Sequence, residues 1–265
     1  MLEYTIHQRK PHFSDIIFIH GLGGNSSIFK NQMDSFKQHF NVITIELPGH
    51  GQSPNVYSYK EPFTFKTVAE EVLKTLDHIK IKEAHFVGVS LGTIVIHQLL
   101  ELAPSRIKSV VMAGAVTRFN LFSKVLLKMG NVAKTFTPHL WIYKLFARIM
   151  LPKKNHKRSR DIFIREATKM ERADFLGWYN IVAKVECVYQ NSRKLPNKIA
   201  KLYVSGREDH LFIKPLLADI KSDHHAKSFV IEQCGHVCNI EKPHEFNHAS
   251  ISFLLNQIKT MKKSS

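Results

Sequence analysis

Short apolar runs alternate with longer stretches of helical periodicity along the first 116 residues. Continuous apolar runs at 15–20 (DIIFIH), 41–47 (NVITIEL) and 108–115 (KSVVMAGA) predict buried strands. A weaker alternation at 2–7 predicts an edge strand. From Thr64 to Ile79, apolar residues recur every three or four positions, which is typical of an amphipathic helix. Strands that alternate with helices predict an α/β fold, with a mostly parallel sheet flanked by helices.

The stretch at 84–102 (AHFVGVSLGTIVIHQLLEL) combines both patterns around a serine. Its first residues predict a buried strand, and the apolar positions after Gly92 predict a helix with one inward face. The turn between them has the sequence Gly-x-Ser-x-Gly. Glycines two residues on either side of Ser90 fit a strained turn that leaves no room for a Cβ there. Such a turn projects the Ser90 hydroxyl clear of the sheet, beside the unpaired N–H groups of a helix start.

The alternation of strands and helices breaks at Thr117. From there to Pro196 the pattern is helical, and no run predicts a strand. The alternation resumes with predicted strands at 198–205 and 228–232 and predicted helices at 215–221 and 244–259. We therefore expect a core made of residues 1–116 and 197–265, with residues 117–196 as a helical insertion.

Charge is concentrated in the same insertion. The whole chain carries a formal net charge of +16, and its 44% of hydrophobic residues suffices for one sizeable core. Residues 117–196 hold 17 Lys and Arg against 5 Asp and Glu, a net charge of +12. The remaining residues are close to balance. The basic character therefore belongs to one segment, which favours a separate structural unit.

Several classes of protein are disfavoured by composition. No apolar run is long enough to cross a bilayer, and the first residues have no apolar segment typical of a secretory signal. The cysteines at 187, 234 and 238 are too few and odd in number for a disulfide framework, which favours a reducing cytoplasm. No motif predicts a metal site or a nucleotide cofactor.

Four motifs occur in order, each after a predicted strand. They are His20–Gly24 (HGLGG), Gly88–Gly92 (GVSLG), Gly206–Asp209 (GRED), and Gly235–His236 leading into Glu241–Pro243 (EKP). The segment Leu47–Ser53 (LPGHGQS) is a fifth supporting match. In these motifs and their order, nearly the whole chain resembles the serine-type α/β-hydrolases, a family of esterase-like and lipase-like enzymes. The resemblance implies that residues 117–196, called the cap below, fold over Ser90 and shape a pocket.

The resemblance also implies a catalytic triad. Ser90 is the candidate nucleophile, and His236, in the loop after the last strand, is the candidate base that a serine hydroxyl needs. Asp209 is the candidate acid that orients the imidazole. Its neighbour Glu208 is the main rival. Some family members carry the acid after an earlier strand, but that position here, Ala113–Thr117, has no carboxylate.

An oxyanion hole needs two N–H groups directed at developing negative charge. The backbone N–H of Leu91, directly after the candidate nucleophile, is one predicted donor. The resemblance implies the backbone N–H of Leu22 as the other. We expect His20 to brace this loop rather than to take part in chemistry.

Three further patterns have competing interpretations. Cys234, His236 and Cys238 are spaced as zinc ligands could be, but no second pair supports such a site. The basic run at 153–160 suits either a phosphate or nucleic-acid patch or a solvated loop. The aromatic residues Trp141, Tyr143, Phe146 and Trp178 either line a substrate tunnel or fill the core of the cap; Trp141 and Trp178 are the candidate substrate-binding residues.

The function that these expectations favour is hydrolysis of a carboxylic ester through an acyl-enzyme, with lipid-like esters among the candidates. The basic and apolar cap also predicts weak association with an anionic membrane surface, and no nucleic-acid partner is expected. Two alternatives stay open. One is a family member with other chemistry, such as a menaquinone-pathway-type lyase, a C–C bond hydrolase or a cofactor-free peroxidase. The other is a binding protein with little turnover.

Overall fold

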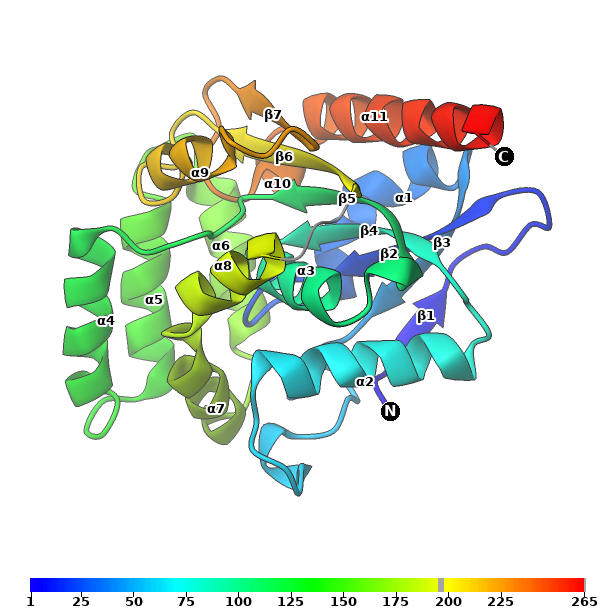
Figure 1. Ribbon diagram of the computed structural model, residues 1–265. Coiled ribbons are helices and arrows are strands. Elements are labelled where there is room, and N and C mark those ends of the chain that lie inside the picture. Colours follow the sequence, from blue (N-terminus) through cyan, green and yellow to red (C-terminus); the bar gives the residue numbers. More distant parts are fainter. Residues whose placement is uncertain (195–197, 265) are drawn as a thin grey trace.

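The computed structural model describes residues 1–194 and 198–264. Its centre is a seven-stranded sheet with the order β1-β3-β2-β4-β5-β6-β7 (Figure 1). Among these strands, β1 alone runs antiparallel to its neighbour, which confirms the mostly parallel sheet predicted from the sequence. The strands are β1 (Tyr4–Ile6), β2 (Ser14–Ile19), β3 (Phe40–Ile45), β4 (Ala84–Val89), β5 (Ile107–Ala113), β6 (Ala200–Gly206) and β7 (Ala226–Ile231).

Helices cover both faces of the sheet (Figure 1). One layer consists of α1 (Lys30–Phe36), α10 (Cys238–Glu241) and α11 (Pro243–Ser264). The other contains α2 (Phe65–His78), α3 (Leu91–Leu102) and α9 (Ile213–Ile220). The arrangement confirms the predicted α/β class.

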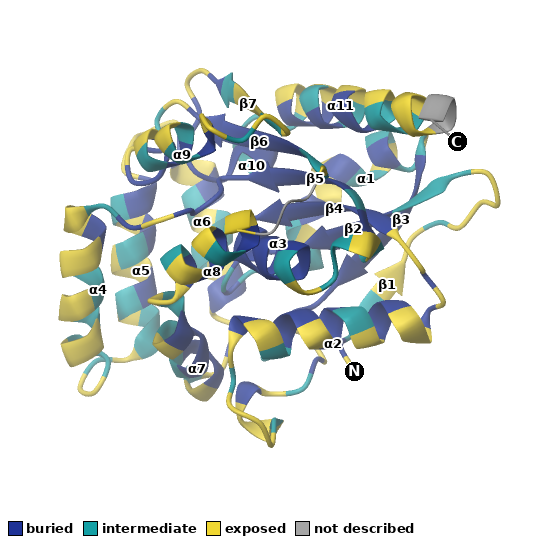
Figure 2. Cartoon of the chain, viewed as in Figure 1, coloured by how far each residue is buried: buried dark blue, intermediate teal, exposed yellow. Residues whose placement is uncertain are grey.

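Successive side chains of each strand enter opposite layers. In β2, Phe18 packs edge-on against Phe36 of α1, with 5.1 Å between ring centroids, and shares a cluster with Phe246 of α11. Its neighbour Ile17 belongs to the cluster formed with α2 and α3. All of β3 and β4 are buried (Figure 2). Burial on both faces explains why these strands are continuous apolar runs rather than alternating ones.

The cap lies between β5 and β6 in the chain. It contains α4 (Leu121–Ala133), α5 (His139–Met150), α6 (Lys157–Ala167), α7 (Arg172–Val182) and α8 (Val185–Lys194). The last of these helices packs against α3, where Ser192 Oγ lies 3.1 Å from His97 Nδ1 and Tyr189 meets the His97 ring edge-on. The predicted cap boundary at Pro196 lies outside the described residues.

The starts of α1 and α9 follow from their first residues. After Asn25, whose side chain accepts a hydrogen bond from the Ser27 N–H, the chain forms a 3-10 turn at Ser26–Phe29 before α1 begins at Lys30. Helix α9 begins two residues before Pro215, because a proline in the first turn of a helix needs no hydrogen-bonded N–H.

Within the described part of the chain, no helix combines the length and the apolar character that crossing a bilayer requires.

The fold predicts that two phenylalanines contribute very differently to the free energy of unfolding. Phe246 is fully buried between α11 and the sheet, so Phe246→Ala should lower the free energy of unfolding by about 3–5 kcal/mol through lost burial and a new cavity. Phe229 lies exposed on β7, and Phe229→Ala should cost less than about 1 kcal/mol. Urea unfolding followed by circular dichroism measures both, and equal losses would contradict this packing.

Candidate active site

The carboxyl ends of β2, β4, β5, β6 and β7 meet at one edge of the sheet, and every residue predicted to act chemically lies in a loop or helix start at that edge. Ser90 directly follows β4. Its φ of 51° and ψ of −114° lie outside the regions that side-chain-bearing residues normally occupy. The Ser90 N–H donates to the Ala113 carbonyl at 2.9 Å, which holds the turn against β5.

Both glycines of the turn are required by close packing. A Cβ on Gly88 would stand 2.8 Å from the Gly92 carbonyl oxygen, and a Cβ on Gly92 would overlap the carbonyls of Ile19 and His20 in β2 and its following loop. Distances of this kind force the backbone to shift. The two glycines therefore allow α3 to begin in direct contact with the sheet, with Ser90 at the apex of the turn.

The structure brings Ser90, His236 and Asp209 together although 146 residues separate the first two. His236 Nε2 lies 2.8 Å from Ser90 Oγ, and His236 Nδ1 lies 2.8 Å from Asp209 Oδ2. His236 is fully buried and Asp209 is 1% exposed, whereas Ser90 is partly accessible. Buried partners strengthen such a hydrogen-bonded chain, because water competes poorly for the donors and acceptors.

Two more glycines admit the histidine loop. A Cβ on Gly114, which has a φ of 54°, would overlap the His236 carbonyl and come within 3.2 Å of its ring. A Cβ on Gly206 would overlap the carbonyls of Cys234 and Gly235. The loop after β7 therefore packs directly on the ends of β5 and β6, and this contact sets the position of His236.

In the loop after β2, the Gly21 carbonyl is hydrogen-bonded but the Leu22 N–H is not, within the described residues. The Gly21 carbonyl accepts from the Gly24 N–H at 3.0 Å and lies 2.8 Å from His20 Nδ1. The Leu22 N–H belongs to the same peptide unit and points the opposite way. Within the described residues, neither the Leu22 N–H nor the Leu91 N–H donates a hydrogen bond. Both predicted oxyanion donors are therefore free to donate to a ligand oxygen.

The next peptide unit of this loop is held at both ends. The Gly23 N–H donates to His50 Nε2 at 2.9 Å, and the Tyr143 hydroxyl in α5 donates to the Leu22 carbonyl at 2.7 Å. Burial lowers the pKa of His50 to about 3, so its ring stays neutral and can accept. Burial raises the pKa of Tyr143, so its hydroxyl stays a donor. The cap thus helps to position a loop of the core.

A family model described as the alpha/beta hydrolase fold matches residues 16–243, most of the chain. The chain belongs to the α/β-hydrolase fold family. This agrees with the resemblance expected from the sequence motifs, and it places the serine turn and the free N–H groups in a fold shared by many hydrolases.

Individual relatives of this α/β-hydrolase are distant. A carboxylesterase structure from Nitrososphaera gargenis superposes with a TM-score of 0.79 at 22% identity, covering 98% of this chain and 96% of that one. The 3-oxoadipate enol-lactonase 1 of Acinetobacter baylyi is 30% identical over 39% of this chain and 37% of its own length. The pimeloyl-[acyl-carrier protein] methyl ester esterase of Methylococcus capsulatus is 31% identical over 40% and 38%. The chain spans 37–38% of the length of these two curated relatives.

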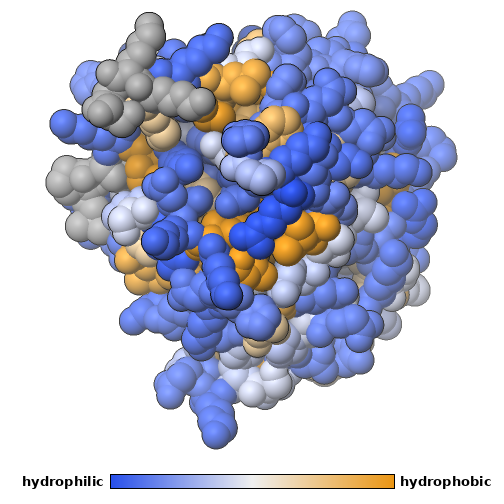
Figure 3. Space-filling model, turned by 90° about the vertical axis from the view of Figure 1, so that its right-hand side faces the viewer, coloured by the Kyte–Doolittle hydropathy of each residue, from blue (hydrophilic) through white to orange (hydrophobic). Residues whose placement is uncertain are grey.

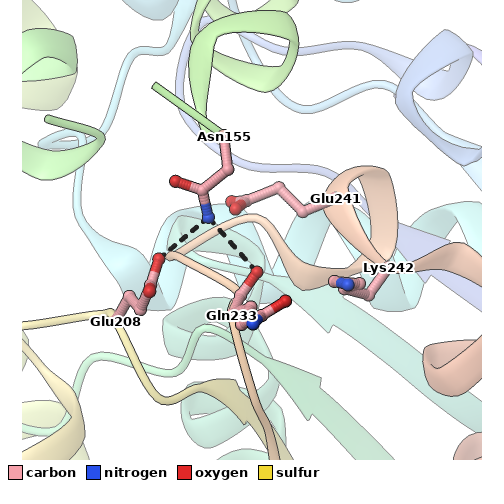
Figure 4. Close-up of a pocket in the computed structure, with 5 residues that line it drawn as sticks. All are labelled: Asn155, Glu208, Gln233, Glu241 and Lys242. Carbon is pink, nitrogen blue, oxygen red and sulfur yellow. Dashed lines mark hydrogen bonds between the residues drawn. The ribbon is translucent and has the colours of Figure 1, made fainter. Parts of the chain in front are cut away.

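Glu208, the rival of Asp209, forms no hydrogen bond or ion pair with His236 among the described residues. It pairs with Lys153 at 2.7 Å and lies 2.8 Å from the buried ring of His156, both from the cap. Hydrogen bonds from Asn155 and Lys153 lower the pKa of Glu208 to about 2. In Figure 4 the Asn155 amide bridges Glu208 and the Gln233 carbonyl across a surface pocket of about 430 Å³. Glu208 therefore joins the cap to the core.

A second carboxylate in the same pocket holds the backbone around His236. Glu241 accepts from the Gly235 N–H at 2.7 Å and from the Val237 N–H at 3.2 Å, the residues on either side of the histidine. Its side chain is 5% exposed and lies 3.6 Å from His156 Nε2. Burial raises the pKa of Glu241, against the opposing effect of these backbone hydrogen bonds. This carboxylate fixes two N–H groups that would otherwise be buried without an acceptor.

An apolar cavity of about 230 Å³ lies between the loop after β2 and the cap. Leu22 lines it on the core side, and aliphatic and aromatic residues of the cap line the rest. The lining residues are Leu22, Phe119, Leu126, Leu127, Met129, Gly130, Ala133, Ile142, Tyr143, Leu145, Phe146, Phe175, Tyr179 and Val182.

Neither predicted tryptophan borders this cavity. Trp141 is 69% exposed on α5. Trp178 is fully buried, donates its indole N–H to the Pro48 carbonyl at 2.9 Å and packs edge-on against Phe63. Of the four aromatic residues singled out in the sequence, Tyr143 and Phe146 contribute to the lining. Helical periodicity could not separate these cases, because it does not say which face of a cap helix is covered.

The structure also shows where the two cysteines beside His236 and the basic run at 153–160 lie. Cys234 and Cys238 are buried, burial raises the pKa of both thiols, and no cluster of three or more possible metal ligands occurs among the described residues. The basic run at 153–160 leads into α6. Within it, Lys153 and His156 contact the core, so the run is only partly a solvated loop.

Four contacts were not found from the sequence: those of His50, Tyr143, His156 and Glu241. His50 and Glu241 stand inside two of the motifs that carry the family resemblance, Leu47–Ser53 and Glu241–Pro243, so their position could have suggested a role. Tyr143 and His156 contact core residues more than 50 positions away, and nothing in the local pattern indicates such partners.

The geometry predicts opposite outcomes for adjacent carboxylates. Asp209→Asn should lower kcat for p-nitrophenyl acetate by about 10³–10⁴-fold, because an amide cannot stabilise the imidazolium or hold its tautomer. Glu208→Gln should lower kcat less than tenfold, since Glu208 does not contact His236. Steady-state kinetics on the two purified variants measures the difference; a larger loss in the Glu208 variant would reverse the assignment.

Glu241→Gln should lower kcat about tenfold and leave KM nearly unchanged. The glutamine NH₂ would face a backbone N–H beside His236, which displaces the histidine without altering the apolar cavity. Glu245→Gln, on the exposed first turn of α11, is the matched control and should leave kcat unchanged. An unchanged kcat in the Glu241 variant would show that the carboxylate does not position the loop.

Proposed function

We propose that this α/β-hydrolase cleaves carboxylic esters whose acyl group is an apolar chain of medium length. The observation that carries the proposal is the unbroken relay from Ser90 Oγ through His236 to Asp209, with 2.8 Å at each step. Hydrolase-family membership and esterase relatives support the reaction class.

The relay suits acyl transfer. Ser90 Oγ attacks the ester carbon while its proton passes to His236 Nε2, and the Asp209 carboxylate stabilises the resulting imidazolium. The carbonyl oxygen becomes an oxyanion that the Leu22 and Leu91 N–H groups can bind. His236 then protonates the leaving alcohol. In the second half, His236 takes a proton from water as the water attacks the acyl-enzyme. When the bond between the acyl carbon and Ser90 Oγ breaks, His236 returns this proton to Ser90 Oγ, and the carboxylic acid leaves.

The cavity supports an apolar acyl group. Leu22 both lines the cavity and carries one proposed oxyanion donor, so a carbonyl bound at that N–H can direct its chain into the cavity. Its 230 Å³ would hold roughly six to eight carbon-sized groups, if each takes about the 30 Å³ of a water molecule. No Lys or Arg is among the described lining residues, which favours this reading over a lyase acting on an anionic metabolite.

The three cysteines are unpaired thiols, which supports a reducing, cytoplasmic location for this activity. The location stays a prediction.

A series of p-nitrophenyl esters from acetate to dodecanoate tests the proposal. We expect kcat/KM to rise to a maximum at about six to eight carbons and then to fall. Ser90→Ala should abolish the activity while leaving the thermal unfolding transition in place. A flat or absent response to all esters would overturn the proposed substrate class.

Filling the cavity should weaken the binding of medium-chain esters and leave short-chain esters nearly unaffected. Ala133→Phe places a ring in the cavity, so KM for the octanoate ester should rise at least tenfold while KM for the acetate ester changes less than threefold. Ala173→Phe, on an exposed position of α7, is the matched control and should change neither. Equal effects on both esters would place the acyl group elsewhere.

A further inference from the structure

The solvent face of α4 is apolar, contrary to what a surface helix normally shows. Phe122, Val125, Met129 and Val132, followed by Phe136 just beyond the helix, recur at intervals of three and four residues. Each of the five is 47–88% exposed. Figure 2 shows α4 as mostly exposed along its length. The spacing places these side chains on one stripe along α4, and one of them, Met129, also lines the apolar cavity.

The stripe continues onto α5. Trp141 and Leu145 are 69% and 54% exposed there. Of the 14 large hydrophobic residues that are exposed in the described chain, eight lie between Leu121 and Leu145. At the opposite end of the molecule, hydrophilic side chains predominate and break the apolar ones into small patches (Figure 3). The apolar surface is therefore gathered on the cap, in an arrangement that marks an interaction site.

Positive charge surrounds this stripe. No acidic residue occurs between Glu101 and Asp161, whereas that stretch holds 13 Lys and Arg. Lys124 pairs with Glu186, and Lys134 lies over the Tyr179 ring. Lys128, Lys144 and Arg148 are exposed on α4 and α5. Of these cations, Lys128, Lys144 and Arg148 form no ion pair with a carboxylate among the described residues, so they remain available to an anionic partner.

We propose that the α4–α5 face docks on the surface of a bilayer that contains anionic phospholipid. Exposed aromatic and aliphatic side chains would enter the headgroup boundary, and the surrounding cations would meet the lipid phosphates. A second copy of the chain fits less well, because a two-fold interface through this face would bring lysines against lysines. The docking does not depend on the proposed ester chemistry.

Vesicle flotation with the full chain tests the proposal. Wild-type protein should bind vesicles of phosphatidylcholine and phosphatidylglycerol (7:3) at least tenfold more tightly than vesicles of phosphatidylcholine alone, and the difference should shrink in 1 M salt. Failure to bind the mixed vesicles would overturn the proposal, whether or not the protein hydrolyses esters. Conversely, binding by a catalytically silent protein would leave the docking surface supported and the proposed function rejected.

Paired variants separate the two contributions. Phe122→Gln with Phe136→Gln should weaken binding to the mixed vesicles at least tenfold, whereas Tyr57→Gln with Phe229→Gln, exposed elsewhere, should change it less than twofold. Lys128→Glu with Lys144→Glu should abolish the preference for anionic lipid, while Lys60→Glu with Lys227→Glu, an identical change in net charge, should preserve it. Thermal unfolding confirms that each variant is folded.

Equal effects of the cap variants and their controls would show that net charge or general hydrophobicity drives the binding, which contradicts a defined face. Light scattering measures whether a second copy of the chain covers the stripe instead. A wild-type dimer that the Phe122 and Phe136 substitutions convert to a monomer would show that a second copy covers the stripe, and the membrane proposal would fall.

Discussion

The backbone at Ser90 is the constraint on which the rest of the site depends. A serine held at a φ of 51° costs of order 1–3 kcal/mol and persists only where its surroundings force it. Here two features impose this conformation. Gly88 and Gly92 allow α3 to begin in contact with the sheet, and the Ser90 N–H donates a hydrogen bond to the Ala113 carbonyl of β5. An ordinary strand conformation would leave the hydroxyl inside the core, out of reach of any base.

Close packing of the backbone also positions the imidazole of His236. Gly114 and Gly206 carry no side chain, so the His236 loop can pack on two strand ends, and Glu241 then satisfies the N–H groups on either side of the histidine. The cap also supports the site. The Tyr143 hydroxyl donates a hydrogen bond to the Leu22 carbonyl, and His156 Nε2 lies within hydrogen-bond distance of the Glu208 carboxylate. The core supplies the reacting groups, and the cap holds part of their scaffold in place.

The sequence predicted the core well because its physical signals are local. Strands buried on both faces must be apolar throughout, and the turn around Ser90 needs its glycines at fixed spacing, so both are visible in a short window. Asp209 and His236 could be proposed from their motifs and their places after predicted strands.

The cap could not be predicted in the same detail. Periodicity shows that a helix has an apolar face, but α4 is apolar on both faces, and only the fold shows which one lines the cavity. Trp141 and Trp178 both stand in predicted helices of the cap, yet Trp141 is exposed and Trp178 is buried where α7 meets the core, against Phe63. Pairings such as Tyr143 with Leu22 join residues 121 positions apart and leave no local trace.

The most direct test of the central claim is to map where a fluorophosphonate reacts. The relay should make Ser90 alone nucleophilic, so mass spectrometry should find the reagent on the peptide that contains Ser90, and His236→Ala should abolish its attachment. Labelling at another serine, or undiminished labelling of Ser90 without His236, would contradict the account.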